Sequence, residues 1–190
     1  MLELSLNILD ICRNAAEAGA RTLKVRMVRK GGVVRLSVED DGCGMEEDVL
    51  ARCTDPFFTT RKTRRTGLGL PLMKACAAGC GGEMRVESEK GRGTRVTVSM
   101  RYDHADCPPM GDLTGTVQAM AAMSSPELSF RYEGAHGCVV LEMKEIKEAL
   151  GAMDCGVLRP KYFTAENRCY QTVCLTADVL EKKLNALRGA

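Results

Sequence analysis

Asp10 and Asn14 are the first residues of this chain whose types and spacing could do chemistry. They lie four residues apart in a segment of helical periodicity, so a helix would bring both side chains to one face. A carboxylate and an amide oxygen placed together are hard ligands of the kind that Mg²⁺ prefers. The alternative is a solvated polar stripe, because Glu3, Asn7 and Glu17 continue the same spacing.

A second group, Asp41-Gly-Cys-Gly44-Met45, directly follows a segment that alternates like a strand. Glycines at 42 and 44 allow the backbone to turn and to approach a flat ring closely. A carboxylate facing such a ring can accept a hydrogen bond from an exocyclic amine, which distinguishes adenine from guanine. Taken alone, this group is a common turn.

Two further groups suit an anion. The segment after Asp55 carries hydroxyl and cationic side chains that could bind polyphosphate oxygens, unless it is simply a solvated basic loop. Gly67-Leu-Gly-Leu70 then opens a helix whose free N–H groups and dipole favour an anion. The polyphosphate candidates are Thr59, Thr60, Arg61 and Lys62.

In this order and at these spacings, the four groups resemble the ATP-binding fold of sensor histidine kinases, type II topoisomerases, heat-shock chaperone ATPases and MutL proteins (the GHKL or Bergerat superfamily). The resemblance covers about residues 4–100. Residues 10–21 are similar to the MutL branch, whereas Asp55-Pro-Phe-Phe-Thr-Thr-Arg, Gly67-Leu-Gly-Leu and Gly82-Glu-Met-Arg-Val-Glu-Ser resemble a histidine kinase or an anti-sigma-factor kinase. The chain is also similar to short stand-alone ATPases found with iron-only hydrogenase subunits in anaerobic bacteria.

The resemblance implies ATP and Mg²⁺ as ligands and gives each group a role. Asn14 would bind Mg²⁺, Asp41 the adenine amine, and Arg61 would stand at the position of the kinase lysine. Asp10 would be the catalytic acid that activates water, although this acid is usually glutamate in hydrolysing branches. The implied ATP-binding residues are Asn14, Asp41, Gly42, Gly44, Met45, Phe58, Thr59, Thr60, Arg61, Lys62, Gly67, Leu68, Gly69, Leu70 and Thr94.

Hydrophobic periodicity predicts the elements that would position these residues. Three helices and two hairpins give an α+β fold, a two-layer α/β sandwich with helices on one face of a mixed, mainly antiparallel sheet. The expected mobile loop covers residues 55–66. The predicted helices are 2–18, 46–53 and 67–78, and the predicted strands are 22–29, 33–40, 84–89 and 94–101.

A polar connector at 103–109 suggests a boundary between an ATP-binding domain, 1–102, and a smaller α+β C-terminal region of unknown role, 103–190. The second part is expected to form either its own domain or an extension of the first sheet. Its predicted elements are helices 111–123, 144–150 and 177–187 and a hairpin of strands 128–133 and 138–143.

The net charge, hydrophobic pattern and cysteine spacing of the chain exclude several classes of protein. A net charge of +2 with both signs mixed gives no nucleic-acid footprint, and no apolar run approaches the ~18 residues of a membrane span. The N-terminus lacks the features of a signal peptide, so a cytoplasmic location is expected. The ten cysteines are then reduced thiols, and neither Cys76/Cys80 nor Cys169/Cys174 has a zinc spacing with a second pair.

Two functions from different classes remain open. The first is a stand-alone ATPase or protein kinase that acts with a protein partner, either a phosphoacceptor or a hydrogenase or redox subunit, while the second half docks that partner or completes a homodimer. The chain begins within the ATP-binding part, so a histidine-bearing helix is not expected, and His104 and His136 lie outside helical patterns. The second function is a non-catalytic, ATP-dependent regulatory module. A MutL-like repair ATPase is disfavoured by the weak charge.

Overall fold

One layer of helices packs against one face of a six-stranded sheet. The structure is a computed structural model that describes residues 3–58, 68–121, 123, 126–134 and 137–143. The helices are α1 (Leu4–Glu17), α2 (Glu47–Arg52), α3 (Gly69–Gly79) and α4 (Leu113–Ala121). The strands are β1 (Thr22–Lys30), β2 (Val33–Asp40), β3 (Glu83–Glu89), β4 (Gly93–Arg101), β5 (Glu127–Gly134) and β6 (Gly137–Glu142).

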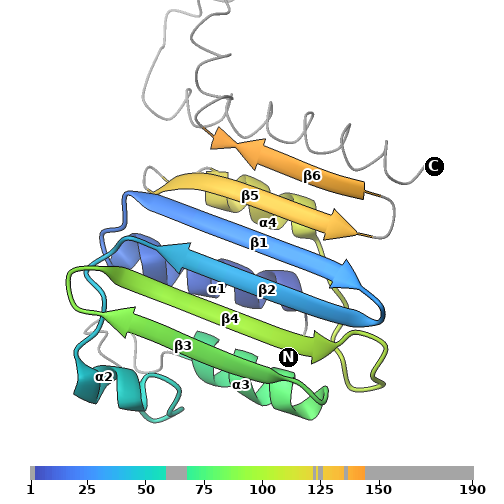
Figure 1. Cartoon of the computed structure of the whole chain (residues 1–190), viewed down its shortest axis with the longest axis horizontal. Helices are drawn as coiled ribbons and strands as arrows, with labels where there is room; N and C mark the ends of the chain where they lie inside the picture. The colour runs from blue at the N-terminus through green and yellow to red at the C-terminus, as the bar shows by residue number, and fades with distance from the viewer. Residues whose placement is uncertain (1–2, 59–67, 122, 124–125, 135–136, 144–190) are drawn as a thin grey trace, which may run out of the picture.

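The strands follow the order β3-β4-β2-β1-β5-β6 across the sheet, and Figure 1 shows α1, α3 and α4 behind it. All neighbouring strands are antiparallel except β1 and β5, which run parallel. A parallel pair needs a crossover connection, and α4 lies in the connection that returns the chain from β4 to β5. The predicted two-layer sandwich with a mixed, mainly antiparallel sheet is confirmed.

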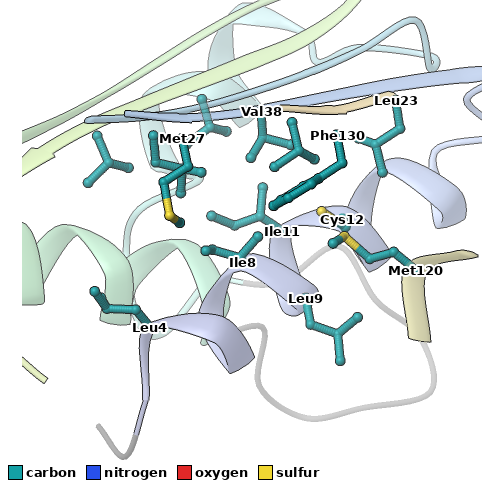
Figure 2. Close-up of a cluster of buried hydrophobic side chains, with 14 of the residues drawn as sticks. Leu4, Ile8, Leu9, Ile11, Cys12, Leu23, Met27, Val38, Met120 and Phe130 are labelled. Atoms are coloured by element: carbon teal, nitrogen blue, oxygen red, sulfur yellow. The ribbon is translucent and has the colours of Figure 1, made fainter. Parts of the chain in front are cut away.

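Alternation along the strands builds the core. In β1 the buried side chains are Leu23, Val25 and Met27, while their sequence neighbours Lys24 and Arg26 are exposed. Because successive strand residues point to opposite faces, one face of the sheet is apolar and receives the helices. Figure 2 shows the apolar side of α1 filling the space beneath these strands.

The strand β5 extends this core beyond the ATP-binding domain predicted from the sequence. Phe130 is 1% exposed, and its ring lies between the sheet and α1, beside Ile11 and Cys12 (Figure 2). Met120 of α4 approaches Cys12 from the other side in the same view. The residues after the connector that the structure describes therefore share one sheet and one core with the residues before it. The division of the chain at 102/103 stays a prediction.

The connector itself runs back to the start of α1. The backbone N–H groups of Leu4 and Ser5 donate to the carbonyls of Pro109 and Met110, each at 3.0 Å. These bonds satisfy donors that have no partner within the helix. The first turn of α1 is thereby fixed by a segment about a hundred residues later in the sequence.

The predicted helices and strands up to 143 are confirmed, with ends that differ by at most two residues. The predicted helices 144–150 and 177–187, and most of the predicted loop 55–66, lie outside the described residues. In the part of the chain that is described, no helix has the length and apolar character needed to cross a bilayer.

Phe130→Ala should lower the free energy of unfolding by about 3–5 kcal/mol, because the change leaves a cavity between β5, β1 and α1. Chemical denaturation measures this loss, and hydrogen exchange should show weaker protection in β1 as well as β5. Glu127→Ala, on the exposed side of β5, is the control and should change stability by less than about 0.5 kcal/mol. Unaltered β1 protection in Phe130→Ala would mean that β5 folds independently.

Candidate functional site

The polar face of α1 lies opposite its buried stripe. Ile8, Ile11 and Ala15 are at most 3% exposed, whereas the carboxylate side chain of Asp10 is 53% exposed. Asn14, one turn further along, is half-buried on the same side of the helix. Burial of the apolar stripe of α1 thus fixes the direction in which the Asp10 and Asn14 side chains point.

Arg13 forms an ion pair with the Asp10 carboxylate, with 3.9 Å between Nη1 and Oδ1. Both side chains are about half exposed, so water screens this ion pair and it contributes little to stability. The Asp10 carboxylate is therefore half-exposed on the polar side of α1.

The first turn of α3 packs against Asp10. A Cβ atom added at Gly69 would lie 3.2 Å from the Asp10 Cβ, so a side chain at Gly69 would fit only if its neighbours moved by a few tenths of an ångström. The helix begins after Leu68, whose side chain makes no capping hydrogen bond, and the first intrahelical bond runs from the Leu72 N–H to the Leu68 carbonyl at 2.9 Å. Free amides at a helix start, together with the helix dipole, form a favourable environment for an anion.

Two adjacent carboxylates follow β2 and play different parts. Asp41 is exposed, and its Oδ1 accepts hydrogen bonds from the backbone N–H groups of Arg21 and Thr22 at 2.7 and 2.8 Å. These bonds fasten the start of β1 and hold the pKa of Asp41 below its ordinary value. The Asp41 carboxylate is thus occupied in joining two segments of backbone.

Asp40 lies on the helix side of the sheet, because it has the same alternation as the buried residues Leu36 and Val38. Its Oδ1 accepts from the Gly42 N–H at 2.9 Å. Burial raises the pKa of Asp40, although the N–H groups of Gly42 and Thr94 partly oppose that rise. Asp40 was not among the predicted site residues. The pattern Asp-x-Gly-x-Gly, counted from Asp40 instead of Asp41, would have found it.

The glycine loop after β2 is pressed against α1 and against the β3–β4 turn. A Cβ on Gly42 would stand 2.8 Å from that of Ala18, and the Cys43 N–H donates to the Ala18 carbonyl at 2.9 Å. Gly44 has a φ of 63°, and a side chain there would overlap the Glu89 carbonyl. Both predicted glycines are therefore required by close backbone approaches.

A hydroxyl network holds the far side of this loop. The Ser88 Oγ accepts from the Met45 N–H, donates to the Gly93 carbonyl, and lies 2.9 Å from the Thr94 Oγ1. A hydroxyl has one proton, so when Ser88 donates to Gly93 the Thr94 hydroxyl must be the donor between the two side chains. The lone pairs of Thr94 then remain for another donor. Ser88, at the end of the kinase-like block at 82–88, was not among the predicted site residues.

The structure brings Gly69 at the start of α3 against Asp10 on the polar side of α1, and Asn14 lies one turn further along that side. Of their predicted neighbours, Leu68 is the N-cap residue of α3 and Leu70 packs against the hydrophobic core. The structure places the predicted residues Asp41, Gly42, Gly44, Met45 and Thr94 around the end of β2 and the β3–β4 turn. Phe58 follows a turn after α2, where its N–H donates to the Asp55 carbonyl and the Arg52 guanidinium lies 4.3 Å from its ring centre. The remaining predicted residues, Thr59, Thr60, Arg61, Lys62 and Gly67, lie outside the described residues.

Within the described ranges, no group of three or more His, Cys, Asp or Glu side chains could hold a metal ion. Mg²⁺ does not require such a cage, since it usually takes one or two protein oxygens and completes its shell with phosphate oxygens and water. The oxygen donors Asn14 and Asp10, next to a helix start suited to phosphate, fit that mode of binding.

Comparisons with known proteins agree with this arrangement. The family described as "Histidine kinase-, DNA gyrase B-, and HSP90-like ATPase" matches residues 2–104. The chain is 46% identical over 72 residues to Sporulation kinase E of Bacillus subtilis, covering 37% of this chain and 10% of that protein. It is 43% identical over 93 residues to Sensor protein kinase FleS of Pseudomonas aeruginosa, covering 48% and 23%. The chain thus spans less than a quarter of either relative.

The fold is also similar to a crystal structure of the N-terminal domain of a DNA repair protein, with a TM-score of 0.53 at 14% identity. This likeness covers 79% of this chain and 57% of that one. It supports the fold well beyond residue 104, and at this identity it supports only the fold.

Asp40→Asn and Asp41→Asn should shift the pH dependence of stability in opposite directions. The pKa of Asp40 is raised from 3.8 in the folded protein, which favours the protonated carboxyl. Its stabilising contribution to the free energy of unfolding is therefore complete below pH 3.8 and is lost as the pH rises through the folded pKa. The pKa of Asp41 is lowered in the folded protein, which favours the ionised carboxylate. Its stabilising contribution to the free energy of unfolding is therefore present above pH 3.8 and is lost as the pH falls through the folded pKa.

Urea denaturation of both variants and the wild type, at pH 7 and at steps towards pH 3, measures this. Wild-type stability minus Asp40→Asn stability should grow as the pH falls, while the same difference for Asp41→Asn should shrink. A drift of both differences in one direction would show that the two carboxylates do not have the environments described.

Proposed function

The chain belongs to the family of histidine kinase-, DNA gyrase B- and HSP90-like ATPases, and from this membership we propose that it is a Mg-ATP-dependent ATPase or protein kinase that acts with a protein partner. The family supplies an ATP-binding, kinase-like domain. The assignment of roles to individual residues, the ion and the partner are our proposals.

The observation that carries the proposal is the spacing of the two polar ends of the site along α1. The glycine loop meets the end of the helix at Ala18, with Asp40 beside Gly42, whereas the start of α3 meets the helix at Asp10. Eight helical residues correspond to about 12 Å, which suits an extended nucleotide with its base at one end and its phosphates at the other. Asn14 lies between the two ends.

At the base end, we assign adenine recognition to Asp40 in place of Asp41. The exocyclic amine of adenine is a donor and needs acceptors facing the helix side of the sheet. Asp40 is there, half-buried, and the lone pairs of the Thr94 hydroxyl are oriented by Ser88. Guanine presents a carbonyl at that position, which would leave the carboxylate facing another acceptor.

At the phosphate end, the first-turn amides of α3 are suited to bind phosphate oxygens. Asn14 would hold Mg²⁺, which supplies charge neutralisation to the phosphates when it is bound. We propose that Arg61 and Lys62 add positive charge from the segment before α3. Since phosphoryl transfer depends mainly on positioning and charge neutralisation, these groups suffice for transfer to a partner's side chain.

The acceptor decides between ATPase and kinase. Hydrolysis requires a group that orients or deprotonates water, and Asp10 is the acid beside the start of α3. Transfer to a protein side chain needs no activated water. The kinase relatives favour a protein acceptor, and a hydrogenase or redox subunit remains the alternative partner.

A non-catalytic regulatory role is the second candidate, and one contact favours it. Arg13 lies 3.9 Å from the Asp10 carboxylate and would compete with a water for its oxygens. Aspartate is also one methylene shorter than the glutamate usual in hydrolysing branches. In this role, ATP would switch a protein surface without turnover.

Asp40→Asn should weaken ATP binding at least about tenfold, because the amide offers one acceptor fewer beside the adenine amine and no charge. Asp41→Asn is the matched control, and its ATP affinity should stay close to that of the wild type. Isothermal titration with Mg-ATP and Mg-GTP measures both, and the preference for ATP should fall only in Asp40→Asn. Equal loss in both variants would contradict the assignment of Asp40 over Asp41.

Phosphate release from Mg-ATP, with and without a partner, tests the reaction. If Asp10 activates water, Asp10→Asn should slow release by about 10²-fold or more while still binding ATP. Asn14→Ala should lose the magnesium-dependent part of ATP binding. Wild-type protein that binds ATP but releases no phosphate and labels no partner with [γ-³²P]ATP would reject catalysis and favour the regulatory role.

A further inference from the structure

Three cysteines from two separate segments meet at the end of α3 that lies away from the nucleotide site. Cys76 is in the last turns of α3, Cys80 is the residue that caps its C-terminus, and Cys107 belongs to the connector after β4. Cys76 and Cys107 both pack against the core cluster that contains Cys80, and the neighbouring Cys80 thiol raises the pKa of each of them. Cys80 is 1% exposed, and the other two are half-buried.

Backbone hydrogen bonds hold together the segments that carry these three cysteines. The Cys80 N–H donates to the Cys76 carbonyl at 3.0 Å, and the Arg101 N–H donates to the Cys80 carbonyl at 3.1 Å. After Arg101 the chain makes two successive turns. In the first, the His104 N–H donates to the Arg101 carbonyl, and in the second, the Cys107 N–H donates to the His104 carbonyl. The connector therefore comes back to the place where α3 ends and brings the third thiol to Cys80.

We propose that Cys80 and Cys107 form a redox-active dithiol, which a low-molecular-weight disulfide such as oxidised glutathione converts into an intramolecular disulfide. The half-buried Cys107 thiolate attacks the glutathione disulfide and releases one glutathione. The Cys80 thiolate then attacks the mixed disulfide and releases the second glutathione. Two protein thiols are oxidised and one glutathione disulfide is reduced to two thiols, with both protons passing to solvent or to the leaving thiolates.

Cys107 is a better disulfide partner for Cys80 than Cys76 is. A disulfide requires Cβ atoms about 3.5–4.5 Å apart, whereas residues four apart on a helix have Cβ atoms about 5–6 Å apart. Cys76 and Cys80 are held at that longer spacing by the helical hydrogen bond between them. Cys107 is on another segment, and its thiol donates to the Pro108 carbonyl at 3.6 Å, a weak bond that is easily exchanged.

Burial and the neighbouring Cys80 thiol raise the pKa of Cys76 to about 12 and that of Cys107 to about 11. Since the thiolate is the nucleophile, exchange is slow at neutral pH, and the test should run at pH 8.5. The new bond would attach the connector to α3, and the connector also carries the bonds to the start of α1.

The experiment incubates the reduced full-length chain with oxidised glutathione, blocks free thiols and digests with trypsin. Cleavage after Lys74, Arg85, Arg101 and Arg131 separates peptide 75–85, which contains Cys76 and Cys80, from peptide 102–131, which contains Cys107. Mass spectrometry should find these two peptides linked, with the blocking group on Cys76. The oxidised chain should also melt at a higher temperature than the reduced chain, because the link restricts the unfolded state.

Cys107→Ser should abolish the linked peptide and the rise in melting temperature. Cys76→Ser is the matched control, since Cys76 is also half-buried against Cys80, and it should form the link at a rate within about threefold of the wild type. The proposal is overturned if Cys43, the exposed thiol of the glycine loop, is fully glutathionylated while no 75–85/102–131 link forms. A link that carries Cys76 in place of Cys80 would also overturn it.

Discussion

The rotation of α1 about its own axis is the constraint on which the site depends. Leu4, Ile8, Ile11 and Ala15 are all at most 3% exposed beneath the sheet. Each large apolar side chain gains about 1.5–3 kcal/mol from burial, so a turn of the helix by one residue would cost several such contributions. This packing, which includes Phe130 from β5, directs the polar stripe of α1 towards α3. The described part of the chain after the connector thus helps to position the site, although it contributes none of the predicted site residues.

The end of β2 shows how strand alternation separates two neighbouring acids. Asp41 accepts two backbone N–H groups at the start of β1 and so stabilises the fold. Asp40 points to the helix side, where burial raises its pKa and opposes ionisation. A half-buried carboxylate lowers stability unless donors replace its lost hydration, and the Gly42 and Thr94 N–H groups only partly offset the effect of burial on Asp40. Retaining one at the end of a buried row is understandable if a ligand donor completes its hydrogen bonds.

Much of this could be predicted from the sequence, because the signals were local. The helical stripe of α1 and the alternation in β1, β2 and β4 gave elements within a few residues of those observed. The choice between Asp40 and Asp41 depends on strand register, because a shift of one residue moves a side chain to the other face, and the local turn pattern did not distinguish the two acids. Ser88 escaped notice because its role depends on the long-range approach of Met45. The parallel pairing of β5 with β1 is likewise non-local, and composition around the connector suggested a boundary instead.

Both ends of the site contain groups that are only partly satisfied by the described protein. Asp40 is a half-buried acid with opposed ionisation, and the N-cap side chain of α3 is leucine, which offers no oxygen to the first-turn amides. A serine or aspartate at Leu68 would stabilise the helix by about 1 kcal/mol but would also place an oxygen where an anion could bind. A ligand with a donor at one end and negative charge at the other would satisfy both groups at once. Binding of such a ligand must then stabilise the folded state in proportion to its affinity, so nucleotide and fold are linked thermodynamically.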